Sequence, residues 1–272
     1  MGQLVCGGIA PHGFSCVGEI SGKEFELFRP TREAMEKLGK FIMDNKPDTI
    51  VILTPHGLRL EGYNAIYTSE YCRGTLNGNG ESVALEYKCN KSLAKEILNR
   101  SVKENIPSVG CNFGGLEGEA SNIEMDWGTF IPLWFCKEAY PKPEIVVIGP
   151  SRDIPLEKLV KLGEIIEQAS EESDKRVAII ASADQGHCHD QKGPYGYNEA
   201  SKEYDEKIMS IINEDDLKQL LDMDMNLVEA AKPDSLWQML ILHGALKVRP
   251  MNGKLLSYEV PTYFGMAVAV YK

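Results

Sequence analysis

The sequence has no long apolar run and no cluster of basic residues. A membrane-spanning helix needs about 20 consecutive apolar residues, and no segment of this sequence approaches that length. Acidic residues number 40 and basic residues 29, so the formal net charge is −11. A chain of this charge without a Lys/Arg cluster lacks the phosphate-binding track of a nucleic-acid-binding protein. We therefore expect no membrane and no nucleic acid among its partners, and a small molecule or another protein instead.

Paired cysteines and a leader sequence are also missing. The seven cysteines are scattered without a Cys-x-x-Cys pair, which argues against a disulfide framework and against a structural zinc site built from thiolates. The first residues show neither a basic leader nor a small-residue cleavage site. We expect reduced thiols and a cytoplasmic location.

Apolar segments of strand length alternate with amphipathic segments of helix length, and no linker or repeat divides the chain. This alternation predicts an α/β fold in which residues 1–272 form a single domain with a central mixed sheet flanked by helices. We expect strands at 4–10, 49–53, 64–69, 82–88, 144–148, 176–181, 255–259 and 265–271, the last two adjacent. We expect helices at 31–45, 91–104, 127–138, 155–170, 201–212 and 235–244.

Two of these helices have polar residues at their expected starts. Thr31 precedes Glu33 and Glu36, and Ser235 follows Asp234. Side-chain oxygens and negative charge at these positions satisfy the unpaired N–H groups of a first helical turn. We interpret Asp234 as part of a helix start.

The tripeptide Pro-His-Gly follows two of the expected strands and contains His12 and His56. Ligand sites of open α/β sheets lie at the carboxyl ends of strands, so the two loops meet if the strands are parallel neighbours. Proline stiffens the approach to each histidine, and glycine leaves the imidazole unobstructed. A single such histidine is more simply one that hydrogen-bonds in a turn. The duplication favours metal binding or catalysis.

Two further segments contain residue types that suit a metal or proton-transfer site. In 179–190, His187 and His189 would face the same side of an extended chain. They could be two ligands, or one acid/base histidine beside a solvated one. Glu259 lies among apolar strand residues and either points to water from an edge strand or points inward. In the second case the chain offers two histidines and one carboxylate, the set that leaves positions open on non-haem Fe(II).

Five segments together resemble the class III extradiol ring-cleavage dioxygenases, the family of the catalytic subunit of protocatechuate 4,5-dioxygenase, and the related Memo-like proteins. The segments run in order from near one end of the chain to near the other, so the resemblance covers essentially all of it. They are GGIAPHG, ILTPHG, MDWGTFIPLWF, ASADQGHCHDQKGPYGYNEASKEYD and SYEVPTYFGMAVA.

The resemblance implies roles for particular residues. The metal ligands fall on His12, His56 and Glu259, and the acid/base histidine on His187. Many members have a substrate-binding histidine where this chain has Trp127. Because tryptophan donates one hydrogen bond and accepts none, it cannot relay a proton; Asp126 would substitute in part, and Trp127 would stack on an aromatic ring. Tyr195 and Tyr197 belong to the segment after His187 and are expected at the substrate.

The implied activity is that of an Fe(II)-dependent extradiol dioxygenase, which opens the ring of a catechol-type substrate with O2. His187 would move the proton, and the chain would form a homo-oligomer. Two alternatives stay open at this point. The same ligands accept Zn(II), as in a hydrolase-like enzyme whose metal activates water. A Memo-like protein would use the pocket for binding without dioxygen chemistry.

Overall fold

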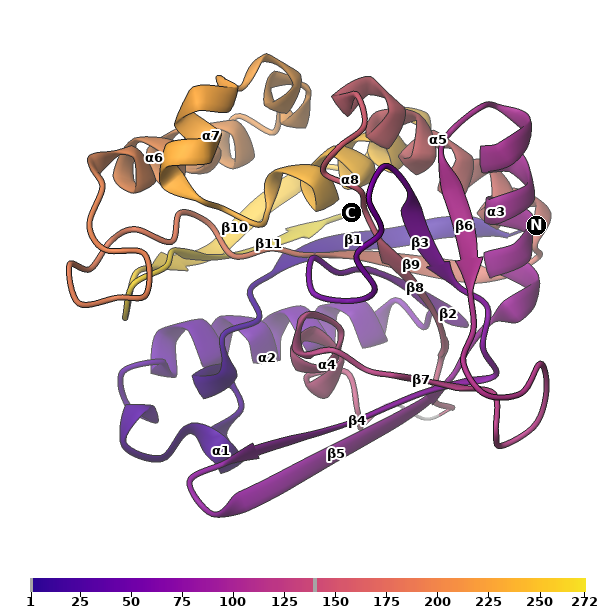
Figure 1. The fold of residues 1–272 in the computed structure, drawn as a ribbon, viewed down its shortest axis with the longest axis horizontal. Coiled ribbons are helices and arrows are strands. Elements are labelled where there is room, and N and C mark those ends of the chain that lie inside the picture. Colours follow the sequence, from indigo (N-terminus) through magenta and orange to yellow (C-terminus); the bar gives the residue numbers. More distant parts are fainter. Residues whose placement is uncertain (1, 139–140) are drawn as a thin grey trace.

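An eight-stranded mixed sheet forms the centre of the computed structural model, which describes residues 2–138 and 141–272 (Figure 1). The four middle strands, β1, β9, β2 and β8, are parallel in that spatial order. On one side β11 and β10 continue the sheet antiparallel; on the other, β3 runs antiparallel to β8 and β6 parallel to β3. The strands are β1 (Gln3–Ala10), β2 (Thr49–Leu53), β3 (Asn64–Tyr67), β6 (Ser108–Cys111), β8 (Glu144–Gly149), β9 (Arg176–Ser182), β10 (Gly253–Glu259) and β11 (Met266–Tyr271).

Helices cover both faces of this sheet (Figure 1). On one face lie α1 (Gly18–Ser21), α2 (Arg29–Asp44) and α4 (Trp127–Trp134); on the other lie α3 (Lys91–Lys103), α5 (Leu156–Glu172), α6 (Glu199–Asn213), α7 (Met225–Ala231) and α8 (Leu236–Val248). Short 3-10 helices span Phe14–Cys16, Gly22–Glu24 and Leu217–Asp222. Across residues 2–138 and 141–272, no helix has both the length and the apolarity to cross a membrane.

The central strands are apolar throughout because each supplies two hydrophobic cores. In β2, Val51 and Leu53 join the core under α5 and α8, whereas Ile50 and Ile52 join the core under α2 and α4. Successive strand residues point to opposite faces, and both faces here are covered. A continuous apolar run is therefore what this position in the sheet requires.

A second sheet of three strands, β5, β4 and β7, lies beyond α1 and α4 (Figure 1). Its strands are β4 (Tyr71–Gly78), β5 (Glu81–Lys88) and β7 (Asn122–Glu124). Asn79 and Gly80 join β4 to β5, with φ angles of 52° and 86°. Asn-Gly is the pair that favours left-handed backbone at both turn positions of a tight hairpin.

Helices α5 and α8 pack backbone to backbone. A Cβ atom added to Gly163 would lie 1.9 Å from the Ile241 carbonyl oxygen, and one added to Gly244 would lie 1.8 Å from that of Val160. Only glycine permits this approach. The contact fixes α8 against α5, and with it Asp234, which lies two residues before the first residue of α8.

The predicted α/β fold, with a central mixed sheet flanked by helices, is confirmed. All eight predicted strands and all six predicted helices are present, with ends shifted by a few residues. The prediction missed β4, β6, β7, α1 and α7, and it extended α4 to residue 138 although the helix ends at Trp134. Both helix starts form differently from the prediction: α2 begins at Arg29, and Ser235 makes no capping hydrogen bond.

Candidate metal centre

His12, His56 and Asp234 come together at the carboxyl ends of the parallel strands. His12 follows β1, His56 follows β2, and Asp234 precedes α8. Strands β1 and β2 are parallel but are not neighbours, because β9 lies between them. The two histidine Nε2 atoms are nevertheless 3.0 Å apart, and Oδ2 of Asp234 lies 3.0 Å from Nε2 of His56 and 3.4 Å from that of His12.

These distances fit a divalent metal ion. Metal–ligand bonds of about 2.1 Å at right angles place neighbouring donor atoms about 3.0 Å apart. The three donor atoms all lie within 4.8 Å of one another. His12 is 2% exposed and Asp234 5%, and burying a carboxylate is costly unless a cation compensates it. Two imidazoles and one carboxylate are also the donor set of non-haem Fe(II) sites with open positions.

Residues at the end of β9, the strand between β1 and β2, hold His12 and Asp234 by hydrogen bonds. Ser182, the last residue of β9, places its hydroxyl 3.0 Å from Nδ1 of His12. The Asp184 carboxylate accepts a hydrogen bond from the His12 backbone N–H at 2.9 Å, and the Asp184 N–H donates to Asp234. Such contacts fix the orientation of metal-binding side chains. The positions of the His12 and Asp234 side chains are therefore set in part by backbone groups that follow β1 and β9.

The buried charges shift one another's pKa values. Burial lowers the pKa of His12, but the carboxylates of Asp184 and Asp234 outweigh it and raise that pKa to about 9. Burial raises the pKa of Asp184 to about 6. Burial also acts to raise the pKa of Asp234, but His12 and His56 hold it well below its usual range. Asp234 is thus a carboxylate at neutral pH, as a metal ligand must be.

His187 lies beside this group with its Nε2 toward Asp234. Its Nε2 is 3.9 Å from Oδ2 of Asp234, and its Nδ1 is buried without a hydrogen-bond partner in the described part of the chain. The ring stacks on Phe264, with centroids 5.5 Å apart. Burial lowers the pKa of His187, which keeps the imidazole neutral at pH 7. A neutral imidazole whose Nε2 faces the metal ligands can accept a proton from a molecule bound there.

The other histidine of that segment has a different environment. His189 Nε2 lies 2.8 Å from the Asp205 carboxylate, which also accepts a hydrogen bond from the Tyr258 hydroxyl. It does not line the cavity that contains His187. The structure therefore gives His187 and His189 different environments, a distinction that the sequence pattern alone does not provide.

A cavity of about 540 Å³ contains the site. Trp127, 39% exposed, stacks on His56 with ring centroids 4.2 Å apart, and Tyr195 meets His187 edge-on at 5.9 Å. Tyr197 lies outside the cavity, where its hydroxyl donates to Glu199. The lining residues are His12, Gly13, Phe14, Ser15, Glu24, Phe28, Pro55, His56, Arg59, Trp127, Arg152, Asp184, His187, Tyr195, Lys232, Pro233, Asp234, Thr262, Tyr263 and Phe264.

The Asp126 carboxylate is engaged by hydrogen bonds from two threonines. Its carboxylate accepts hydrogen bonds from the Thr54 hydroxyl at 2.5 Å and from both the N–H and the hydroxyl of Thr129. These contacts cap the start of α4. Asp126 lines a neighbouring cavity of about 650 Å³, which shares His56 and Trp127 with the metal centre.

The glycines of the two Pro-His-Gly tripeptides make room for aromatic residues. A Cβ atom on Gly57 would lie 2.5 Å from the Tyr67 hydroxyl oxygen, and one on Gly13 would lie 3.0 Å from the Phe264 ring. Glycine lets an aromatic side chain pack against the histidine loop.

Glu259 requires a correction as well, because it does not lie with the two histidines. It ends β10, the edge strand, and β11 separates it from β1. Its carboxylate accepts a hydrogen bond from the Thr31 hydroxyl of α2 at 3.2 Å. The carboxylate beside the histidines belongs to Asp234, so the predicted set of His12, His56 and Glu259 becomes His12, His56 and Asp234.

Sequence reasoning missed Asp234, Tyr263 and Phe264 at the site. Asp234 was interpreted as a helix start, because an acidic residue before an apolar helix fits that role. A signal was present: the helix that follows is apolar on nearly every side, and nine of its residues are buried. A carboxylate at the start of such a helix is buried with it and needs a positive partner.

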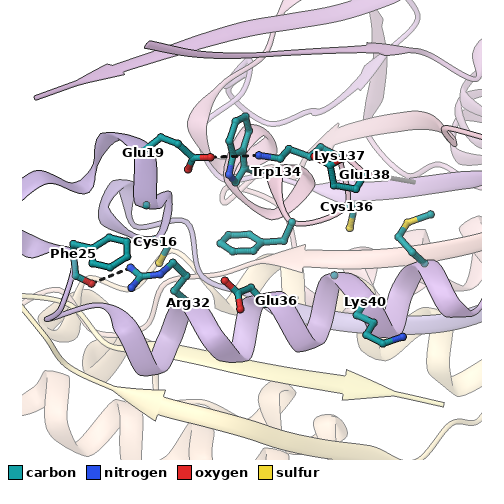
Figure 2. A pocket seen from close by; sticks show the side chains of 14 residues that line it. Cys16, Glu19, Phe25, Arg32, Glu36, Lys40, Trp134, Cys136, Lys137 and Glu138 are labelled. Carbon is teal, nitrogen blue, oxygen red and sulfur yellow. Dashed lines mark hydrogen bonds and ion pairs between the residues drawn. The ribbon is translucent and has the colours of Figure 1, made fainter. Parts of the chain in front are cut away.

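The two cavities nearest in size to this one differ from it in chemistry. The first is the apolar one beneath Trp127. The second, of about 680 Å³, lies between α2 and the end of α4 (Figure 2). There Lys137 pairs with Glu19 at 3.5 Å, and Arg32 donates to the Phe25 carbonyl at 2.9 Å. Within residues 2–138 and 141–272, the only group of three or more metal-ligating side chains is His12, His56 and Asp234.

Known proteins resemble this chain at low identity. Protein CA_C1420 of Clostridium acetobutylicum is 29% identical over 97% of this chain, which spans 56% of that protein. A 3,4-dihydroxyphenylacetate 2,3-dioxygenase of Escherichia coli is 22% identical over 82% of each chain. The solved structure of the uncharacterized protein JW3007 from Escherichia coli K12 has the same fold, with a TM-score of 0.61 and 14% identity over 98% of this chain and all of that one.

The family follows from a match over nearly the whole sequence. The family model described as "Catalytic LigB subunit of aromatic ring-opening dioxygenase" matches residues 8–271. That range includes both histidine loops, His187 and Asp234. The chain therefore belongs to the family of catalytic LigB subunits of aromatic ring-opening dioxygenases.

Proposed function

We propose that this protein is a non-haem Fe(II)-dependent extradiol dioxygenase that opens the ring of a catechol-type substrate with O2. The observation that supports this most is the meeting of His12, His56 and Asp234 in one cavity with His187, whose Nε2 lies 3.9 Å from Oδ2 of Asp234. The family supports a ring-opening dioxygenase. The substrate in the name of the Escherichia coli relative is itself a catechol.

His12, His56 and Asp234 would hold the metal ion, which supplies Lewis acidity and an open face where both reactants meet. His187 would take the proton of a catechol hydroxyl through Nε2, since burial lowers the pKa of its ring and Nε2 lies on the side of the metal ligands. Phe264 holds that ring by stacking. Proton transfer is thus assigned to a group fixed beside the ligands.

Aromatic side chains would position the substrate ring. Trp127 covers His56, and Tyr195 and Tyr263 lie within 6.0 Å of the His187 ring centroid. Aromatic rings favour offset-stacked or edge-to-face contact with another ring. A planar aromatic substrate therefore contacts apolar surfaces on two sides of the proposed metal site.

We also expect the chain to form a homo-oligomer.

Oxygen uptake by reconstituted protein tests the proposal. Metal-free protein is loaded anaerobically with Fe(II), and O2 consumption is followed with a panel of catechols that differ in their ring substituents. We expect uptake to match substrate loss one to one, with a ring-opened product. Fe(II)-loaded His187→Gln is the matched control, because it should bind metal but turn over slowly.

Two results would contradict the proposal. The first is absence of uptake across the panel while Fe(II) stays bound at one ion per chain. The second is metal-activated hydrolysis by the Zn(II)-loaded protein in the absence of O2, which would favour the hydrolase-like alternative instead.

A further inference from the structure

The loop that joins β6 to β7 carries the two most exposed large apolar side chains in the described part of the chain. Phe113 is 73% exposed and Leu116 is 81% exposed. In Figure 1 this loop projects from the edge of the molecule, at the lower right. Single exposed apolar residues are common on protein surfaces. Two of them on one projecting loop indicate a contact surface where other apolar groups lie beside them.

Hydrogen bonds and glycines fix the shape of this loop. The Gly115 N–H donates to the Ala120 carbonyl, and Lys91 of α3 donates to the Leu116 carbonyl at 2.8 Å. Gly114 has a φ angle of 78°, and a Cβ atom there would lie 2.0 Å from the Ala120 carbonyl oxygen. The loop therefore holds its apolar side chains outward in a defined conformation. A preformed loop loses little conformational entropy when it binds a partner.

Phe113 also lines an apolar cavity. This cavity, of about 650 Å³, is lined as well by the exposed side chains of Leu58 and Trp127, and its buried wall includes Ile123. Leu116 lies three residues beyond Phe113 in the same loop. We call Leu58, Phe113, Leu116 and Trp127 the loop surface. An apolar surface that combines a projecting loop with a cavity offers both a group to insert and a place to receive one.

Two charges of opposite sign flank the loop surface. Arg59 follows Leu58, Glu117 follows Leu116, and both charged residues are exposed. Within residues 2–138 and 141–272, neither of them forms an ion pair. A two-fold dimer joins the same surface on both copies, so that Arg59 of one copy can meet Glu117 of the other and the reverse contact follows by symmetry. The loop surface is therefore complementary in charge to a second copy of itself.

From these features we infer that the loop surface is the contact between two copies of this chain. Phe113 and Leu116 of one copy would pack against Leu58 and the apolar cavity of the other, with Arg59 and Glu117 paired at the rim. The inference rests on the expected homo-oligomer, not on dioxygenase activity, and names the surface through which the homo-oligomer forms.

The proposed contact lies beside the metal centre. Trp127 lines the apolar cavity and also stacks on His56, with ring centroids 4.2 Å apart. A second copy that closes the cavity would remove more of Trp127 from water. The packing of Trp127 on a proposed metal ligand would then depend on dimer formation.

Shortening the apolar side chains of the loop tests the surface. Sedimentation equilibrium of the purified protein measures the dissociation constant of the dimer. We expect Phe113→Ser and Leu116→Ser each to raise that constant roughly 30-fold, the effect of losing one dominant contact residue. Met225→Ser is the matched control and should leave the constant unchanged, because Met225 is 45% exposed on α7, away from the loop surface. Circular dichroism checks that each variant is folded.

Two charge reversals test the two-fold arrangement. Arg59→Glu and Glu117→Arg should each raise the dissociation constant about tenfold or more, because each places like charges together. An equimolar mixture of the two variants should dimerise about as tightly as the unmodified protein, since every contact then joins opposite charges again. Lys254→Glu changes an exposed cation outside the loop surface and should dimerise as the unmodified protein does.

Three results would overturn the inference. The first is a monomer at every concentration, which would also remove the expected homo-oligomer. The second is a dimer whose dissociation constant does not change in Phe113→Ser or Leu116→Ser; the homo-oligomer would then stand, but through another surface. The third is a mixture of the two charge variants that does not dimerise, which would exclude the pairing of Arg59 with Glu117. Oxygen uptake decides the proposed function separately from all three.

Discussion

The cavity at the metal centre and the cavity between α2 and α4 are similar in size, at about 540 and 680 Å³, but their charged groups are in opposite situations. In the second cavity, Lys137 is paired with Glu19 and Arg32 with a backbone carbonyl (Figure 2). At the metal centre, within the described residues, Nε2 of His187 lies 3.9 Å from Oδ2 of Asp234, beyond hydrogen-bond distance, and the cavity-lining Arg152 forms no ion pair.

This difference shows what distinguishes a binding site from a gap between helices. Polar groups that the fold leaves unpaired in a cavity cost stability, and a ligand that pairs with them recovers that cost. Volume alone does not indicate function. The following changes test the distinction, from the largest expected effect to the smallest.

Removing a ligand from the metal centre should abolish metal binding. We expect His12→Ala, His56→Ala and Asp234→Ala each to reduce bound metal from one ion per chain to a trace, because two remaining donors hold a divalent ion weakly. Elemental analysis after dialysis measures the occupancy. Glu259→Gln is the matched control and should keep full occupancy. Full metal in Asp234→Ala with loss in Glu259→Gln would restore Glu259 as the ligand.

Replacing His187 should stop turnover without releasing the metal. General acid–base catalysis contributes roughly 10²–10⁴-fold, so kcat of His187→Gln should fall by that order. Steady-state O2 uptake gives kcat, and elemental analysis gives metal content. Loss of metal in this variant would show that His187 is a ligand, contrary to the role assigned here.

Metal affinity should rise with pH in the neutral range. The neighbouring carboxylates raise the pKa of His12 from 6.5 to about 9 in the metal-free protein, so metal must displace a proton below that pH. We expect affinity to rise about tenfold per pH unit between about pH 6.5 and 9. Calorimetry in buffers of different ionisation enthalpy counts the protons released. An affinity that does not change over this range would contradict a raised pKa.

The same shift has a consequence for stability. A histidine whose folded-state pKa is raised stabilises the fold fully below its unfolded value of about 6.5, and this contribution is lost as pH rises through about 9. The metal-free protein should therefore lose stability over that window. The metal-bound protein should not, because its His12 carries no proton to lose. Thermal unfolding of both forms from pH 6 to 9 measures the difference.

A change in the second cavity should have the smallest effect. Glu19→Gln breaks an exposed ion pair with Lys137, and such pairs contribute about 0–1 kcal/mol. We expect a shift in unfolding free energy within that range by denaturant titration, with metal binding and activity unchanged. A change in metal affinity would show that the two cavities are coupled through α2 or α4.

Much of the fold can be predicted from the sequence because the spacing of hydrophobic residues indicates which side chains are buried. The continuous apolar runs of β2 and β8 could only be strands covered on both faces. The strands that were missed are those with weaker patterns. β4 includes Arg73 and two glycines, and β7 has only three residues. Their place in the second sheet depends on pairing with distant strands, which periodicity does not reveal.

Part of the candidate site can also be predicted from the sequence, for a different reason. His12 and His56 were found because a repeated tripeptide marked two strand ends. Asp234 is far from both histidines along the chain, and the packing of α8 against α5 together with hydrogen bonds to Asp184 brings it to them. The cost of burying a carboxylate was also the argument for Glu259, which Thr31 and its edge position satisfy instead.

The most direct test of the central claim is the position of the metal itself. An anomalous difference map from crystals of the anaerobically Fe(II)-loaded protein, collected at the iron edge, locates the ion without assumptions about its ligands. We predict a single peak about 2.1 Å from Nε2 of His12, Nε2 of His56 and a carboxylate oxygen of Asp234. A peak bonded to Glu259, or no peak between the two histidines, would contradict the account.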